Sequence, residues 1–166
     1  MWTLRRRAAR LVVLDPSDRV LLLQARDPVD PAKGEWWEIP GGGIEAGETG
    51  AEAAERELEE ETGITGVAMW GCAWRQRSRF VFAGIGFDQD EEIHVARVAT
   101  PALDDDWKPS GLEALEAAAF QSQRWWELDE LEALVEGGGR VIPPWLAGEL
   151  RRYLAEGPPA EPVVMG

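Results

Sequence analysis

A helix bounded by glycines constrains this chain more than any other segment. Residues 49–62 are rich in Ala, Glu, Leu and Arg, which favour helix, and apolar residues recur among them at helical spacing. Thr49 is a suitable N-cap, and Gly63 follows as a C-terminal stop. Residues 40–43 read Pro-Gly-Gly-Gly, which we expect to form irregular backbone. The sequence therefore predicts a loop, a helix and a second loop in succession.

Three carboxylates share one face of this predicted helix. Glu57, Glu60 and Glu61 are spaced i, i+3 and i+4, so their side chains project together and repel one another. A hard cation such as Mg²⁺ or Mn²⁺ prefers carboxylate oxygens and would turn the repulsion into binding. Helix composition alone equally fits a solvated acidic face, which we expect for the other glutamates of the segment.

The spacing of these glutamates favours the metal-binding interpretation. From Gly42 the chain reads GGIEAGETGAEAAERELEEETGI, which resembles the Nudix box G-x(5)-E-x(7)-R-E-U-x-E-E-x-G-U, where U is bulky and apolar. Seven of the matched positions have a fixed residue type, so a chance match is on the order of one in 10⁸ per starting point. The residues at the defined positions are Gly42, Glu48, Arg56, Glu57, Leu58, Glu60, Glu61, Gly63 and Ile64. Residues 37–42 and the stretch RWWELDEL from Arg124 are similar to further Nudix segments.

The resemblance to the Nudix (MutT-like) hydrolases implies both a fold and an activity. The implied fold is α+β, an α/β/α sandwich in which a mixed sheet lies between helices and the box forms loop-helix-loop. The implied activity is Mg²⁺- or Mn²⁺-dependent attack of water on phosphorus, which cleaves a phosphoanhydride bond in a nucleoside triphosphate or in a nucleoside diphosphate linked to another group.

The resemblance also implies roles for individual residues. Glu57, Glu60 and Glu61 would bind the metal, and Glu57 and Glu60 would take part in catalysis. Arg56 would orient the glutamates, including Glu48, through charge-assisted hydrogen bonds. The glycine-rich loop, with Gly41 and Gly42, would let the substrate approach the backbone.

Residues outside the box are also candidates for the site. Members of the family often have a further catalytic carboxylate outside the box, at a position that varies. Here Glu91 and Glu92 precede a strand-like segment, in which their side chains would face opposite sides. We favour Glu92 as a catalytic residue, although both could be solvated turn residues. Arg75 and Arg77 would share one strand face and could bind phosphates, or could simply face solvent.

The rest of the chain reads as short strands and two further helices. A single domain is expected over residues 1–156, followed by a loosely held Pro-rich tail at 157–166. Residues 101–111 should form an acidic connection. Strands are expected at 10–14, 20–24, 36–39, 64–74, 80–87, 93–99 and 118–126, the last of these being the final strand, and helices at 128–135 and 144–155.

Composition restricts the partners of the chain. The 166 residues carry a formal net charge of −14, which argues against nucleic-acid binding but permits a small nucleotide substrate, because metal and local arginines can reverse the sign in a cavity. Cys72 is the only cysteine, and no apolar run approaches the roughly 18 residues that span a membrane. We therefore expect a cytoplasmic protein without a membrane partner. The family resemblance makes a homodimer possible.

Two other functions are compatible with a Nudix fold. A non-hydrolytic nucleotide sensor would be expected to lose metal-binding glutamates, and this box retains all of them. An isopentenyl-diphosphate isomerase relies on a cysteine and a histidine-rich metal site, which one histidine and an isolated Cys72 fit poorly. Among hydrolases, the sequence leaves open oxidised nucleoside triphosphates, ADP-ribose, dinucleoside polyphosphates and nucleotide sugars.

Overall fold

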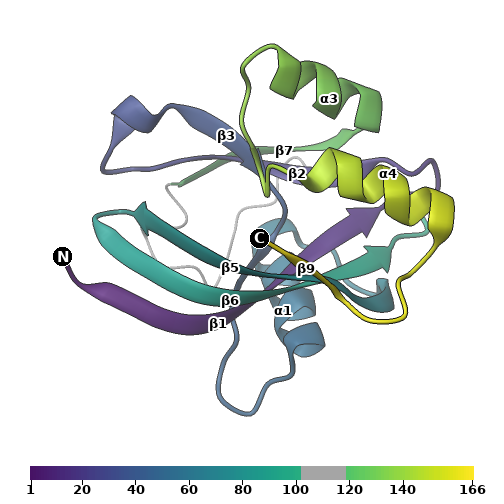
Figure 1. Ribbon diagram of the computed structural model, residues 1–166, viewed down its shortest axis with the longest axis horizontal. Coiled ribbons are helices and arrows are strands. Elements are labelled where there is room, and N and C mark those ends of the chain that lie inside the picture. Colours follow the sequence, from purple (N-terminus) through teal and green to yellow (C-terminus); the bar gives the residue numbers. More distant parts are fainter. Residues whose placement is uncertain (102–118) are drawn as a thin grey trace.

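The protein, described here from a computed structural model over residues 1–101 and 119–166, is built around one mixed, curled β-sheet (Figure 1). A short 3₁₀ helix, η1 (Pro31–Lys33), precedes the third strand. The strands of the described part are β1 (Thr3–Leu14), β2 (Val20–Arg26), β3 (Glu35–Glu38), β4 (Gly41–Gly43), β5 (Ala68–Phe82), β6 (Ile85–Arg97), β7 (Phe120–Trp126), β8 (Val141–Ile142) and β9 (Val163–Met165).

Strand β1 is the centre of the sheet. The order is β8-β3-β2-β1-β6-β5-β9, with β4 added to β1 and β7 added to β2. Strand β1 pairs with β6 in parallel from Thr3 to Leu14, but its recorded pairing with β2 is limited to Leu14 and Val20, at the turn that joins them. Away from this turn, β8-β3-β2 on one side and β1-β6-β5-β9 on the other are not paired with each other. The candidate site lies between these two halves of the sheet.

Helices cover both faces of the sheet, which confirms the predicted sandwich. Helix α1 (Gly50–Thr62) packs on one face, where Leu58 meets Leu11 and other odd-numbered residues of β1. Helices α3 (Leu128–Glu136) and α4 (Leu146–Glu156) lie with the second core, which contains Val12 and other even-numbered residues of β1. The alternation of a strand thus places successive β1 side chains in two different cores. Within residues 1–101 and 119–166, every helix is too short or too polar to cross a bilayer.

Helix α1 begins and ends where the sequence predicts. The hydroxyl of Thr49 accepts a hydrogen bond from the Glu52 backbone at 3.1 Å, and the Glu52 carboxylate accepts one from the Thr49 backbone at 3.1 Å. This reciprocal pair satisfies two N–H groups that the first turn would otherwise leave unbonded. Gly63 ends the helix in the left-handed region, with φ of 80°, which a glycine adopts without strain.

The expectation of irregular backbone at residues 40–43 is wrong in part. Residues 41–43 form β4, which pairs antiparallel with residues 8–10 of β1. Glycine permits this close pairing, since a Cβ atom on Gly41 would lie 2.5 Å from the carbonyl oxygen of Ala9. The absence of side chains therefore lets a glycine run add to the sheet rather than leave it.

The strand predicted at residues 80–87 spans a turn instead. Strands β5 and β6 form one long antiparallel hairpin that turns at Ala83 and Gly84, both with positive φ. The strand was predicted to be continuous because apolar residues lie on both sides of the turn. The start of β5 at Ala68 also shortens the strand predicted from residue 64. Most of the connection predicted at 101–111 lies outside the described residues.

The tail is held to the sheet, so the expectation of a loose tail is wrong. Strand β9 pairs in parallel with residues 74–76 of β5, and Val163 and Met165 pack against the larger core. Strand β7 is consequently not the final strand. Residues 157–166 are rich in proline, but residues 163–165 are apolar and form the edge strand next to β5.

A buried ion pair joins β1 to β6 within the sheet. Arg10 Nε donates to Glu91 Oε2 at 2.8 Å, and the Glu91 side chain is only 1% exposed. Gln76, Ser78 and Gln89 donate three further hydrogen bonds to the same carboxylate at 2.7–2.9 Å. Burial alone would raise the pKa of Glu91, but the charge of Arg10 and these hydrogen bonds lower it from 4.5 to about 2.

The substitution Glu91→Gln should destabilise the protein in a pH-dependent way. A carboxylate with a depressed pKa stabilises the fold fully above the pKa of its unfolded state, and this contribution is lost as the pH falls through about 2. We expect the variant to lose about 3 kcal/mol of unfolding free energy near neutral pH, with Arg10 left buried and unpaired. The deficit should shrink progressively as the pH falls below 4.5.

Urea unfolding across this pH range measures the effect. The control is Glu59→Gln, because Glu59 is an exposed residue of α1. A deficit that stays constant down to the acid limit of the fold would contradict the assigned role of the Glu91 charge.

Candidate active site

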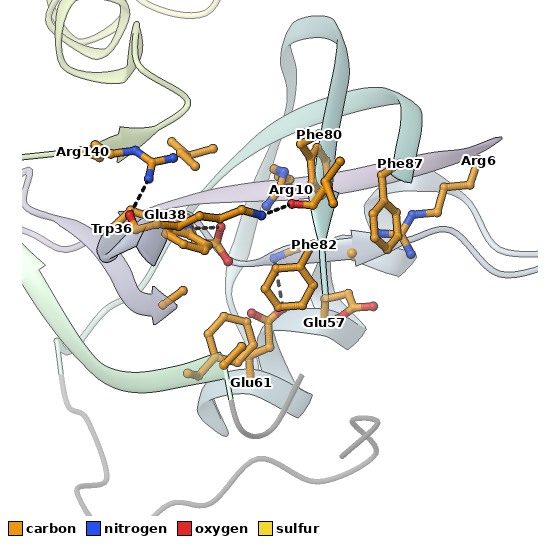
Figure 2. Close-up of a pocket in the computed structure, with 18 residues that line it drawn as sticks. Arg6, Arg10, Trp36, Glu38, Glu57, Glu61, Phe80, Phe82, Phe87 and Arg140 are labelled. Carbon is orange, nitrogen blue, oxygen red and sulfur yellow. Dashed lines mark hydrogen bonds between the residues drawn. The ribbon is translucent and has the colours of Figure 1, made fainter. Parts of the chain in front are cut away.

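A cavity of about 360 Å³ lies between the two halves of the sheet, beside α1 (Figure 2). This volume is within the range of small-ligand sites. Its lining combines basic, acidic, aromatic and glycine residues. These are Arg6, Arg10, Lys33 and Arg140; Glu38, Glu57 and Glu61; Trp36, Phe80, Phe82, Phe87 and Phe120; and Gly41 and Gly42.

Two box glutamates reach this cavity from one face of α1. Glu57 and Glu61 are one helical turn apart, and both line the cavity. The Glu57 carboxylate lies against Gly42, where an added Cβ atom would meet Glu57 Oε1 at 2.5 Å. The backbone N–H of Gly41 donates to Glu61 Oε1 at 3.0 Å. The glycine strand and the helix thus position the two carboxylates together.

The pair of carboxylates has the donor chemistry that a divalent cation requires. Burial, and then the negative charge of Glu57, raise the pKa of Glu61 well above its ordinary value. Two buried carboxylates next to each other destabilise the fold, through desolvation and mutual repulsion, unless a cation neutralises their charge. Carboxylate oxygens suit Mg²⁺ and Mn²⁺, so Glu57 and Glu61 could hold such an ion.

Arg56 ties the glycine strand to the glutamates. Its guanidinium donates to both oxygens of Glu48 at 2.7 and 3.0 Å and to the carbonyl oxygen of Gly43 at 3.0 Å. It also donates to Glu57 at 3.1 Å and to Glu60 at 3.3 Å. The side-chain hydrogen bond from Arg56 lowers the pKa of Glu48. These are the contacts that an orienting role for Arg56 needs.

The other acidic candidates lie apart from the cavity lining. Glu60 contacts Arg56, and its side chain is 26% exposed. Glu92 lies on the α1 face of the sheet, where it contacts Arg7 at 3.0 Å and His94 at 3.5 Å. Glu91 has the opposite orientation, toward the interior beneath the cavity, but four hydrogen bonds already occupy its carboxylate.

Arg75 and Arg77 also lie outside the cavity. Arg77 donates to both oxygens of Asp88 on the exposed side of the hairpin, and its side chain is 50% exposed. Arg75 is exposed and pairs in register with Glu92. The structure therefore brings Glu57, Glu61, Gly41 and Gly42 together and does not bring these two arginines to them.

The basic residues that do line the cavity are not among the site residues predicted from the sequence. Arg6 and Arg10 share one face of β1, so their even spacing was a usable signal. Lys33 and Arg140 come from η1 and from the loop before β8, and their convergence depends on the tertiary fold. Lys33 Nζ is held by Asp27 at 2.7 Å, and Arg140 donates to the carbonyl oxygen of Lys33 at 3.1 Å.

Glu38 is a further buried acid in the cavity wall. Trp36 Nε1 donates to its carboxylate at 3.0 Å, and burial raises its pKa despite the nearby charge of Arg10. Glu38 belongs to the predicted segment 37–42, but the sequence did not indicate that it lines the cavity.

Comparison with known proteins identifies the family. The sequence model of the NUDIX domain matches residues 4–146. The chain belongs to the Nudix family.

Individual Nudix relatives are distant. An RNA pyrophosphohydrolase of Caulobacter vibrioides is 28% identical over 146 residues, which cover 75% of this chain and 73% of that protein. An octanoyltransferase of Myxococcus xanthus is 51% identical over 49 residues, but this segment spans only 13% of that protein. The structure of an Ap4A hydrolase complex from C. elegans superposes with a TM-score of 0.56 at 24% identity, covering 90% of this chain and 96% of that one. These comparisons support a pyrophosphohydrolase of the Nudix family and leave the substrate open.

The contact between Gly42 and Glu57 predicts the effect of one added methyl group. In Gly42→Ala the new Cβ would have to displace the Glu57 carboxylate, which it would otherwise approach to 2.5 Å. We expect the affinity for Mn²⁺ to fall at least about tenfold, as happens when the support of a metal ligand is disturbed. Titration calorimetry measures this affinity, and circular dichroism verifies the fold. Gly148→Ala is the control, because a Cβ there meets nothing within 4 Å; equal Mn²⁺ affinity in both variants would refute the assigned geometry.

Proposed function

We propose that this Nudix protein uses Mg²⁺ or Mn²⁺ to hydrolyse a phosphoanhydride bond in a small nucleotide. The substrate class is a nucleoside triphosphate or a nucleoside diphosphate linked to another group. The observation that carries the proposal is the orientation of Glu57 and Glu61 into a cavity that also holds basic and aromatic side chains. One cavity thus offers donors for a cation, cationic groups for phosphates and rings for a nucleobase.

Glu57 and Glu61 are the central metal ligands in this proposal. Glu60, which lies beside Glu57 on Arg56 at 3.3 Å, would be the third ligand. These residues would hold a divalent ion that, when bound, would neutralise charge on the phosphates and lower the pKa of a water molecule. Arg56 then keeps Glu57 in place through its anchor on Glu48.

The basic residues would bind the phosphates that carry the remaining negative charge. Arg6, Lys33 and Arg140 line the cavity from three separate elements, so they can contact an extended phosphate chain. Arg10 contributes positive charge, but its hydrogen bond to Glu91 fixes it in the wall. These residues replace Arg75 and Arg77 as the proposed phosphate-binding groups.

The proton of the attacking water requires a carboxylate that reaches the cavity. Glu57 and Glu61 meet this condition, whereas Glu92 lies on the α1 face of the sheet. We therefore place the general base among the box glutamates rather than at Glu92.

Neither alternative function gains a supporting observation. The sensor hypothesis predicts tight nucleotide binding without turnover. The isomerase hypothesis needs a cysteine in the reaction cavity, but Cys72 is beside Glu92 and His94, none of which lines the cavity.

A substrate panel tests the proposed activity. It should include oxidised nucleoside triphosphates, ADP-ribose, dinucleoside polyphosphates, nucleotide sugars and a 5′-triphosphorylated oligonucleotide. We expect Mg²⁺-dependent release of nucleotide or phosphate from at least one member. Turnover should fall at least about tenfold in Glu57→Gln, Glu60→Gln and Glu61→Gln.

The control for these variants is Glu59→Gln, an exposed glutamate of the same helix. It should retain the wild-type rate. Wild-type rates in all three box variants would refute the proposed metal site, while binding without turnover across the whole panel would favour the sensor.

The aromatic lining predicts how the base is held. Phe80 and Phe87 stack on each other with ring centres 5.0 Å apart, whereas Phe82 stacks on no other ring among the described residues. A nucleobase stacked on Phe82 would gain about 1–3 kcal/mol, so Phe82→Ala should raise KM by about 5- to 160-fold. kcat should change much less, because the ring does not hold the phosphates. Steady-state kinetics of Phe82→Tyr, which keeps the ring, provides the control; an unchanged KM in Phe82→Ala would exclude stacking there.

A further inference from the structure

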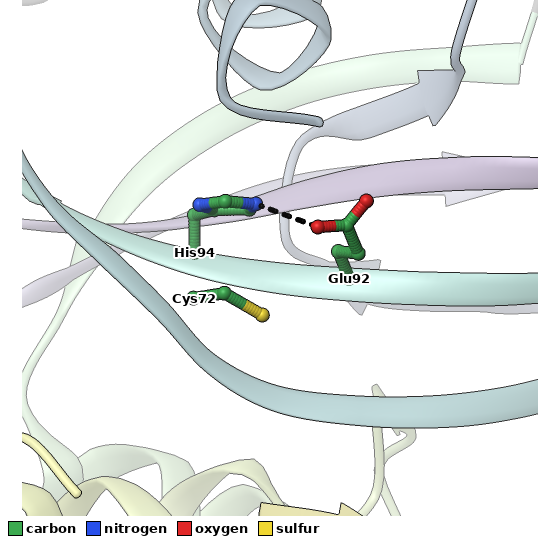
Figure 3. A group of neighbouring side chains, drawn as sticks. All are labelled: Cys72, Glu92 and His94. Carbon is green, nitrogen blue, oxygen red and sulfur yellow. Dashed lines mark ion pairs between the residues drawn. The ribbon is translucent and has the colours of Figure 1, made fainter. Parts of the chain in front are cut away.

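Three side chains capable of binding a metal meet on the α1 face of the sheet (Figure 3). Cys72 of β5 is paired in register with His94 of β6, and Glu92 precedes His94 by two residues on the same strand face. One ligand atom from each residue lies within 4.8 Å of the other two. None of the three lines the cavity that contains Glu57 and Glu61.

His94 supplies an independent sign that a ligand is missing from this cluster. The residue is only 6% exposed, and neither ring nitrogen has a well-formed hydrogen bond to any residue of 1–101 and 119–166. Its Nε2 atom makes only a long ion-pair contact with Glu92 Oε1 at 3.5 Å, and its Nδ1 atom has no contact of either kind within the described part of the chain. Buried polar groups are normally satisfied, so an imidazole whose only contact is one long ion pair leaves room for a further partner such as a metal ion.

The Glu92 carboxylate is oriented toward the histidine by its other contacts. Arg7 donates to Glu92 Oε2 at 3.0 Å, which leaves Oε1 directed at His94. Gly50, the first residue of α1, makes room for this arrangement, because a Cβ there would lie 2.5 Å from Oε2. Outer contacts of this kind commonly fix the orientation of metal-binding carboxylates.

The chemistry of the three groups selects the class of metal. Sulfur and imidazole nitrogen favour Zn²⁺ and similar transition metals over Mg²⁺, and a mixed Cys, His and carboxylate set is compatible with tetrahedral zinc. The thiol of Cys72 now donates to the Trp74 carbonyl oxygen at 3.3 Å and would lose its proton to solvent on binding. The thiolate and Glu92 would then supply two negative charges, which offset the nearby Arg7 and Arg75.

We propose that Cys72, Glu92 and His94 form a second metal site, specific for a Zn²⁺-type ion and separate from the box glutamates. Water or an external ligand would take the fourth position. The ion would link β5 to β6 beside the first turn of α1 and stabilise this region. Glu92 then serves this site instead of the hydrolytic reaction.

The unique histidine and cysteine of the chain make the proposal directly testable. Metal-free full-length protein should bind Co²⁺ with the near-ultraviolet charge-transfer band of a cobalt–thiolate bond, and this band should saturate at one ion per chain. Zn²⁺ should shift the imidazole resonances of His94 in ¹H–¹⁵N spectra and protect Cys72 from alkylation. Mg²⁺ should do neither.

Variants separate this site from the catalytic one. Cys72→Ser should abolish the charge-transfer band, and His94→Gln should weaken Zn²⁺ binding at least about tenfold. Glu57→Gln with Glu61→Gln should retain the band, since those residues belong to the cavity. Asp90→Asn is the matched carboxylate control, because Asp90 precedes Glu92 by two residues on the same strand face and is 57% exposed in its side chain.

The wild-type measurements decide the matter even if His94→Gln does not fold. Unchanged His94 resonances and unprotected Cys72 in saturating Zn²⁺ would overturn the proposal. A cobalt band that disappears with the box glutamates instead of with Cys72 would overturn it equally.

Discussion

The hydrogen bonds of one guanidinium hold the candidate active site together. Arg56 contacts Glu48 before α1, the Gly43 carbonyl of β4, and Glu57 and Glu60 on α1 itself. Without this guanidinium, the loop before α1, strand β4 and helix α1 would face one another only with carboxylates and a carbonyl oxygen, which repel each other. The multidentate geometry available to arginine fixes their relative positions in a way that a lysine ammonium would not. Gly42 of β4 completes the arrangement, because a side chain there would displace Glu57.

Successive side chains of β6 point to opposite faces of the sheet, so polar residues of this strand are divided between the cavity side and the α1 side. Phe87 lines the cavity and Glu91 accepts a hydrogen bond from Arg10 of the cavity wall, whereas Glu92 and His94 face α1. Adjacent glutamates thereby enter different electrostatic environments, one saturated by Arg10 and three further donors and the other beside an unsatisfied imidazole. This separation explains why the proposed second metal site does not compete with the box for the same ion. On these proposals a hard ion would bind the carboxylates of the cavity, and a softer ion the thiol and the imidazole.

Local sequence information was sufficient for α1 and insufficient for the cavity. Thr49, Gly63 and the spacing of the box act within a few residues, so the helix and the grouping of Glu57 with Glu61 could be predicted. The choice between the faces of β6 depends on how that strand pairs with β1, which no local pattern reveals. The same is true of the C-terminal tail, whose residues 163–165 gain a partner only when β5 is in place. Lys33 and Arg140 illustrate the limit most clearly, because 107 residues separate two groups that are joined by a hydrogen bond.

The net negative charge of the chain repels an anionic substrate, whereas the basic residues of the cavity attract it. A net charge of −14 repels an extended polyanion over the outer surface, while four basic side chains in the cavity attract phosphates at short range. Screening at physiological ionic strength confines each effect to about 8 Å, so a compact nucleotide that fits within the cavity mainly experiences the basic lining. A long nucleic acid would keep most of its phosphates near the acidic surface. The electrostatics of the protein therefore favour a substrate whose negative charge is concentrated in a few phosphates next to Glu57 and Glu61.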